Sequence, residues 1–152
     1  MLERGRIRAL VDSCDGELAA RRVLIPRLLG MEDSSRYWSI WMTLDHLRIT
    51  NLAFAHVMEE LTQGRVPEGK ASTAAVKPDP GVGAGVDSEY EKSCETLLAV
   101  VDGVKEWRSE PRYEHPWFGP MNAQAWHGLA GAHMGIHRTQ MEEILRCLRR
   151  RS

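Results

Sequence analysis

Long apolar runs are missing from this sequence. None of its hydrophobic stretches approaches the roughly 20 residues that a membrane-spanning helix needs. The first residues, Met1 to Arg6, lead directly into a charged segment and contain no apolar core of a signal peptide. We therefore expect a cytoplasmic protein with no membrane association.

An excess of either charge is also missing. The 20 lysine and arginine residues balance 21 aspartate and glutamate residues, which leaves a formal net charge of −1. Such a balance provides no field that would attract nucleic acid, so we expect no nucleic-acid partner. The basic C-terminal segment, which contains Arg146, Arg149, Arg150 and Arg151, is best explained as cations that complement the dipole at the end of a helix.

Cysteine is scarce, and its three positions cannot form a disulfide framework. Cys14, Cys94 and Cys147 are odd in number, far apart and free of any Cys-x-x-Cys pair. This usage is typical of a reduced compartment. Each cysteine falls at a core-facing helical spacing, so we interpret all three as small hydrophobic residues rather than as nucleophiles or ligands.

Apolar residues recur three and four positions apart in four segments, which predicts amphipathic helices. No strand-like alternation competes with this pattern. A Ser34 or Ser35 N-cap begins the second helix, and an Asn122 N-cap begins the last. We therefore predict an all-α protein, a four-helix bundle in one domain covering residues 1–152. The expected helices span residues 3–27, 34–61, 87–107 and 122–149.

Two segments rich in proline and glycine separate these helices. Residues 62–86 contain three prolines and five glycines, which predicts a long crossover loop with little regular structure. A second loop follows the third helix, and the aromatic residues Tyr113, Trp117 and Phe118 lie in it. The sequence leaves open whether the crossover is mobile or covers a site.

Histidines on apolar helix faces are the strongest functional signal. His133 and His137 lie four residues apart, so one turn of helix places both rings on the same buried face. His46 lies near the middle of the apolar face of the second helix. Buried imidazoles need partners, and two neutral rings on one apolar stripe have no obvious one. We therefore predict a mononuclear metal site formed by His46, His133 and His137.

Three histidines suit Zn²⁺, Ni²⁺, Cu²⁺ or Fe²⁺, and we expect zinc or nickel, with iron or manganese as alternatives. A site with three protein ligands leaves a position for water or substrate, which is the arrangement of catalytic rather than structural zinc. Gln140 is a candidate to orient a ring; Asp45 is another, although its helical position predicts an outward side chain. Met134 follows the first histidine where a zincin would have glutamate, and the Glu-x-x-His motif of di-iron bundles is absent.

The remaining histidines carry weaker signals. His56, His115 and His127 are interpreted as surface or packing residues. The tryptophans at positions 38, 41, 117 and 126 are interpreted as core or as pocket wall. Glycines at positions 128, 131 and 135 share one strip of the last helix, which suggests the close approach of another helix or of a second subunit.

Two motifs resemble the DinB-like (damage-inducible, YfiT-like) metalloprotein superfamily. They are Trp38-Ser39-Ile40-Trp41-Met42-Thr43-Leu44-Asp45-His46-Leu47 and His133-x-x-x-His137-x-x-Gln140. The stretch His115-Pro116-Trp117-Phe118-Gly119-Pro120-Met121, followed by Trp126, is similar to one subgroup. The resemblance implies an up-up-down-down-type bundle with a long crossover, often a homodimer, and a divalent metal held by His46, His133 and His137.

The resemblance also implies a possible activity. Characterised relatives include transferases and isomerases that use a low-molecular-weight thiol. One hypothesis is therefore a metal-dependent transferase acting on a small-molecule substrate with such a thiol. A metal-dependent hydrolase is a second hypothesis, weakened because the predicted core faces carry no additional carboxylate base. A third is a stress-response protein that binds metal or ligand without turnover.

Overall fold

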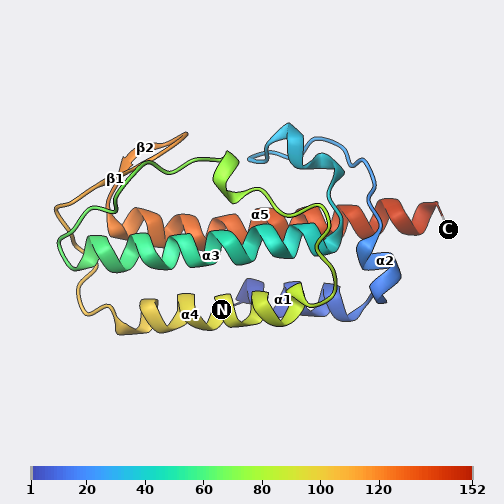
Figure 1. Cartoon of the computed structure of the whole chain (residues 1–152), viewed down its shortest axis with the longest axis horizontal. Helices are drawn as coiled ribbons and strands as arrows, with labels where there is room; N and C mark the ends of the chain where they lie inside the picture. The colour runs from blue at the N-terminus through green and yellow to red at the C-terminus, as the bar shows by residue number, and fades with distance from the viewer. Residues whose placement is uncertain (1, 152) are drawn as a thin grey trace.

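The computed structural model describes residues 2–151. Two long helices, α3 (Ile40–Thr62) and α5 (Ala123–Arg150), lie side by side and form the centre of an elongated bundle (Figure 1). The helices α1 (Leu2–Asp12) and α4 (Val86–Gly103) cover one side of this pair, and connecting segments cover the other side. The four-helix bundle predicted from the sequence is therefore confirmed.

The central helices begin where short polar side chains satisfy the first backbone N–H groups. The Ser39 side chain accepts a hydrogen bond from the Met42 amide, and the Asn122 side chain accepts one from the Ala125 amide. The cap at Asn122 confirms the sequence prediction. The second helix begins at Ile40 rather than at residue 34, and its N-cap is Ser39 rather than Ser34 or Ser35, because residues 33–37 form a short 3₁₀ turn, η1 (Asp33–Tyr37), ahead of it.

The first predicted helix is wrong beyond its first half. It ends at Asp12, and a short helix, α2 (Gly16–Ala20), follows after a break. At the break, the side chains of Ser13 and Cys14 hydrogen-bond back to carbonyls of the preceding turn, while Asp15 caps the new helix by accepting from the Leu18 amide. The chain then runs without regular structure to residue 32.

The crossover predicted at residues 62–86 is present between α3 and α4, with a short 3₁₀ helix, η2 (Ala74–Val76), inside it. Gly64 ends α3 with φ +81°, a left-handed conformation that favours glycine. The crossover is bound to α3 by Asp45, whose carboxylate accepts hydrogen bonds from the Asp79 amide (2.9 Å) and the Arg48 guanidinium (2.8 Å). The outward position expected for Asp45 is wrong: its side chain is buried, because the crossover covers that face of α3.

The third predicted helix ends at Gly103 rather than at residue 107, and the loop after it contains a β-hairpin that the sequence analysis missed. Its strands, β1 (Tyr113–His115) and β2 (Gly119–Met121), pair antiparallel with Tyr113 opposite Met121. Strands of three residues are too short to show alternation in the sequence. The hairpin packs through Tyr113 against Trp126, whose indole N–H donates to the Tyr113 carbonyl (3.3 Å).

The glycine strip of α5 is open within the described part of this chain. A Cβ built at Gly128 or Gly131 would meet no atom within 4 Å, and one at Gly135 would only touch Glu3 of α1 at 4.0 Å. No helix within residues 2–151 therefore packs closely against Gly128 and Gly131. Across that same span, no helix combines the length and the apolarity needed to cross a membrane.

Candidate metal centre

The three histidines singled out in the sequence converge on the loop-covered side of the α3–α5 pair. His46 comes from the second turn of α3, and His133 and His137 come from consecutive turns of α5. Their ring centroids lie 4.5 to 5.0 Å apart, and one ring nitrogen from each lies within 4.8 Å of the other two. The structure thus brings all three predicted residues together, and their role as metal ligands stays a prediction.

The crossover fixes the proton on His46. Its Nδ1 lies 2.7 Å from the carbonyl oxygen of Val76 in η2. A carbonyl can only accept, so His46 Nδ1 must be the donor and Nε2 must carry the lone pair when the ring is neutral. That Nε2 points toward His133, whose own Nε2 is 3.1 Å away. The loop is therefore part of the site, because it sets which nitrogen of His46 is free to bind.

Gln140 sets the orientation of His137 in the same way. The Gln140 amide nitrogen donates to the Ser35 carbonyl (2.8 Å), which leaves its oxygen to accept from His137 Nδ1 (2.6 Å). His137 Nε2 therefore carries a lone pair as well. Gln140 is fully buried and belongs to the same helix as His137, so it holds the ring rigidly. The prediction that Gln140 orients a histidine is confirmed.

No described residue holds a proton on Nδ1 of His133 as Val76 and Gln140 do for the other two rings. Whether the three rings fit a metal ion can be judged from this unpartnered nitrogen and from the distances between the ring nitrogens. His133 Nδ1 is buried without a hydrogen bond among the described residues, although a buried imidazole nitrogen ordinarily has one. Two nitrogens bound at roughly 2 Å to one ion can be at most roughly 4 Å apart. The 3.1 Å between the Nε2 atoms of His46 and His133 falls inside that limit, and the set of three ring nitrogens, which lie within 4.8 Å of one another, would need only a small shift of the rings to share one ion. Because His46 Nε2 carries a lone pair, His133 Nε2–H donates to it, and His133 Nε2 becomes a third metal-binding nitrogen when its proton moves to the unpartnered Nδ1. Three neutral imidazoles are the donor set that Zn²⁺ and Ni²⁺ accept.

The surroundings keep the rings neutral and therefore ready to coordinate. Burial lowers the pKa of His137 to about 3, helped by the nearby ring of His46. Burial, with the repulsion of the other two rings, puts the pKa of His133 well below its usual value, and burial also lowers the pKa of His46. Trp38 contributes to this burial by stacking on His137, with ring centroids 6.2 Å apart. Metal binding therefore releases no net proton from these rings at neutral pH.

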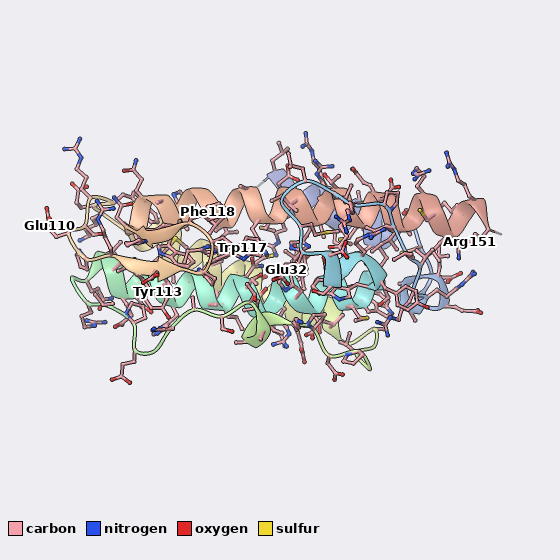
Figure 2. All side chains as sticks on the ribbon, turned by 90° about the horizontal axis from the view of Figure 1, so that it is seen from above. Glu32, Glu110, Tyr113, Trp117, Phe118 and Arg151 are labelled. Atoms are coloured by element: carbon pink, nitrogen blue, oxygen red, sulfur yellow. The ribbon has the colours of Figure 1, made fainter. Side chains whose placement is uncertain are left out.

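A cavity of about 150 Å³ opens beside the three rings. Its wall is mostly apolar and aromatic, with several polar side chains, and two of these are relevant to the chemistry although the sequence does not assign them to the site. Glu32, from the segment before η1, and His115, from the end of β1, both line the cavity. Viewed from above, Glu32 and the hairpin residue Trp117 lie over the middle of the α3–α5 pair (Figure 2). His115, which the sequence predicts to be a surface or packing residue, packs on Phe118 and Trp126 and also lines the cavity.

Other candidates lie elsewhere. His56 is exposed on α3, and His127 is exposed on α5, where its ring stacks on Trp107 at 4.3 Å. None of the three cysteines lines the cavity. Cys94 is buried between α3 and α4, and burial raises the pKa of its thiol, as it does for Cys14. These two thiols are therefore inert, as the sequence predicts.

The comparisons with known proteins follow this geometry. The family model of the DinB superfamily matches residues 2–141. The chain belongs to the DinB superfamily. Among solved structures, the crystal structure of TT2238, a four-helix bundle protein, matches with a TM-score of 0.65 over 93% of this chain and 90% of that one, at 17% sequence identity. At that identity the likeness establishes the fold of this DinB protein alone, and no curated protein gives a significant match.

Proposed function

We propose that this DinB protein holds one divalent metal ion through His46, His133 and His137. The observation that carries the proposal is that two of the rings have their protons fixed on Nδ1. Val76 accepts the Nδ1–H of His46 and Gln140 accepts that of His137, so the Nε2 lone pairs of both rings are free to bind an ion. A core histidine that only filled space would need no such arrangement, and His133 Nδ1 would not be left without a partner.

We further propose that the centre serves a transferase that uses a low-molecular-weight thiol. A bound divalent ion supplies a Lewis acid that keeps a coordinated thiol deprotonated and nucleophilic near neutral pH. The chain supplies no thiol of its own to the cavity, so the thiol comes from solution. The chain's contribution is to keep three rings neutral, to fix two of them, and to surround the reacting groups with an apolar wall that excludes water.

Metal content tests the first part of the proposal. Protein purified without an affinity tag is expected to contain about one zinc or nickel ion per chain by elemental analysis. His133→Ala/His137→Ala is expected to contain none. His56→Ala/His127→Ala is the matched control, because it removes two histidines from the same helices outside the cavity and should keep the metal. A metal-free wild type that takes up neither zinc nor nickel would refute the centre.

The transferase is tested with metal-loaded protein, a panel of small thiols and an electrophile. His46→Ala should abolish thiol consumption, while the same protein keeps its helical circular dichroism spectrum. Loss of electrophile that does not depend on added thiol would contradict the proposal.

Loss of the electrophile without added thiol would instead indicate a hydrolase, and one feature of the cavity supports this alternative. Glu32 provides the cavity with the carboxylate base that the sequence analysis did not find. Its charge acts on His46, where it favours the protonated ring. For a hydrolase, ester cleavage would proceed without thiol and would be lost in Glu32→Gln, whereas thiol transfer would survive that change.

A further inference from the structure

The cavity beside the histidines has a size that limits what it can hold. Its volume of about 150 Å³ matches cavities that accept benzene-sized molecules. Four aromatic side chains from four different parts of the chain line it: Trp38, Phe54, Trp117 and Trp126. Aromatic faces and edges favour a flat ring over a bulky aliphatic group. The enclosed part is therefore a site for one small planar group, and a whole thiol cofactor has to remain outside it.

Polar side chains such as Glu32, Thr50 and Lys77 also line the cavity, and His115 is the one that the hairpin holds against the aromatic residues. His115 Nδ1 accepts hydrogen bonds from the backbone amides of Trp117 (3.1 Å) and Phe118 (3.3 Å). A nitrogen that accepts twice is unprotonated, so the neutral ring carries its proton on Nε2. Burial lowers the pKa of His115, which favours that neutral form. The Nε2–H has no hydrogen-bond partner among the described residues, and the ring lines the cavity.

The packing of His115 holds its ring at the hairpin end of the cavity. The ring stacks on Phe118 with centroids 4.8 Å apart and lies 5.4 Å from Trp126, the α5 residue two turns before His133. His115 is therefore held from both sides at the hairpin end of the same cavity that the metal-binding histidines line. A donor N–H without a partner on the aromatic side of the cavity favours ligands that bring an acceptor, because an unpaired polar group there costs free energy.

We propose that the cavity binds a small aromatic molecule bearing a carbonyl-type acceptor, and that His115 Nε2–H donates a hydrogen bond to that acceptor. The inference rests on the proposed function, since it names the class of small molecule that lies beside the metal centre. His115 is then a specificity-determining residue of the site. The hairpin sets its tautomer, because the amides of the turn donate to Nδ1 of this last residue of β1.

The test compares three ligands by isothermal titration calorimetry on metal-free protein. Acetophenone has the ring and the carbonyl, ethylbenzene has the ring without an acceptor, and cyclohexyl methyl ketone has the acceptor without a flat ring. Wild type is expected to bind acetophenone about fivefold to tenfold more tightly than ethylbenzene, the factor that one net hydrogen bond supplies. Cyclohexyl methyl ketone should bind more weakly than acetophenone.

Two substitutions remove the donor in different ways. His115→Phe keeps a ring but loses both nitrogens, and His115→Asn keeps a side-chain acceptor for the turn amides but has no donor at the position of Nε2. Both should reduce the preference for acetophenone over ethylbenzene to about one. Each variant should retain wild-type metal content, because His115 is not among the three ligands.

Two results would overturn the proposal. Equal affinity of wild type for acetophenone and ethylbenzene would mean that the N–H does not meet the occupant. No binding of either aromatic compound would mean that the cavity does not take this class of ligand. Since the titrations use metal-free protein, these failures are distinct from failure of the metal centre, which the elemental analysis of wild type and the histidine variants decides.

Discussion

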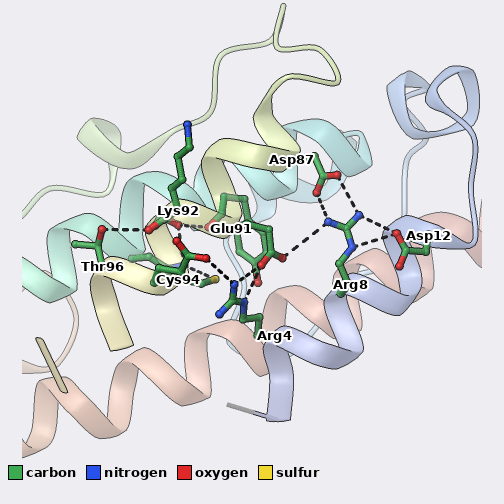
Figure 3. A network of polar contacts seen from close by, with 12 residues as sticks. Arg4, Arg8, Asp12, Asp87, Glu91, Lys92, Cys94 and Thr96 are labelled. Carbon is green, nitrogen blue, oxygen red and sulfur yellow. Dashed lines mark hydrogen bonds and ion pairs between the residues drawn. The ribbon is translucent and has the colours of Figure 1, made fainter. Parts of the chain in front are cut away.

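The two sides of the α3–α5 pair carry polar clusters of opposite design. On the side covered by α1 and α4, arginines from α1 meet carboxylates from α4: Arg8 contacts Asp87 at 2.6 Å and Arg4 contacts Glu91 at 2.7 Å (Figure 3). On the loop-covered side, three identical rings that cannot neutralise one another face a cavity. The first cluster pairs opposite charges, and the second gathers three neutral rings with no carboxylate among them.

This difference separates a structural cluster from a functional one without reference to any relative. The arginines of α1 are partly exposed and pair with carboxylates, an arrangement that needs no further ligand. On the other side, His133 Nδ1 is buried beside a cavity and has no hydrogen bond to any described residue, which costs stability unless something binds the rings. The helices hold the arginine cluster on one side, whereas the crossover and the residues before α3 hold the histidines on the other through Val76 and Ser35. The two sides should therefore respond differently to acid, to metal and to substitution.

Acid gives the largest expected contrast. Because burial lowers the pKa of His133 and His137 in the folded chain, the unfolded chain, with pKa values near 6.5, takes up protons first as the pH falls. The contribution of these neutral rings to the free energy of unfolding is complete above about pH 6.5. It decreases as the pH falls below that value, toward the folded pKa of about 3 for His137. Between about pH 7.5 and about pH 5.5, metal-free protein should lose about 3 kcal/mol of unfolding free energy from these two rings.

Urea titrations in the presence of a chelator measure this loss. His133→Leu/His137→Leu should flatten the dependence on pH, since leucine has no proton to gain. The arginines of the opposite cluster stay charged throughout this range and should add no slope, because hydrogen bonds to Asp87 and Glu91 raise the pKa of Arg8 and Arg4. An equal slope in wild type and in the leucine variant would contradict the assignment of this effect to the histidine side.

Metal gives the next largest contrast. An ion that binds only the folded chain stabilises it by about 2.7 kcal/mol at a hundredfold excess over Kd. For a chain of this size, that stabilisation corresponds to an increase of about 5–10 °C in Tm. Thermal unfolding followed by circular dichroism should show this increase in wild type and in Arg8→Met, and should show none in His46→Ala. An increase that persists in His46→Ala would place the ion elsewhere.

Much of the fold can be predicted from the helical spacing of apolar residues, and the exceptions arise from contacts that this spacing does not reveal. The spacing of apolar residues locates α3, α4 and α5, and the i, i+4 pair on α5 locates half of the site, because both signals lie within one helix. The break after Asp12 escapes this reasoning because the apolar stripe continues across it, while Ser13, Cys14 and Asp15 redirect the backbone with side-chain hydrogen bonds. Helical periodicity does not reveal a competition of that kind.

The second half of the site depends on contacts between distant segments. Gln140 could be predicted, because it lies three residues from His137 on the same helix face. The Val76 carbonyl is 30 residues from His46 in a loop, and carbonyls leave no mark in a sequence. Glu32 and His115 reach the cavity from segments that the prediction treated as connections. The buried position of Asp45 depends on the same crossover, so a helical wheel of α3 alone assigns it to the wrong side.

The smallest contrast concerns the arginine side itself. Arg8→Met keeps the aliphatic contact of the side chain but removes the bonds to Asp87 and the ion pair with Asp12. Hydrogen bonds between charged groups contribute about 1.5–3 kcal/mol, and solvent screens this half-exposed pair, so we expect a loss of about 1–2 kcal/mol in urea unfolding.

A double-mutant cycle with Asp87→Asn should assign most of that loss to the pair, and added salt should reduce it. Metal content and metal-induced stabilisation should stay at wild-type values in all three variants of the cycle. If breaking the pair lowered metal affinity, the two sides of the α3–α5 pair would be coupled through the packed helices between them. The arginine cluster would then help to position the histidines rather than stabilise the bundle alone.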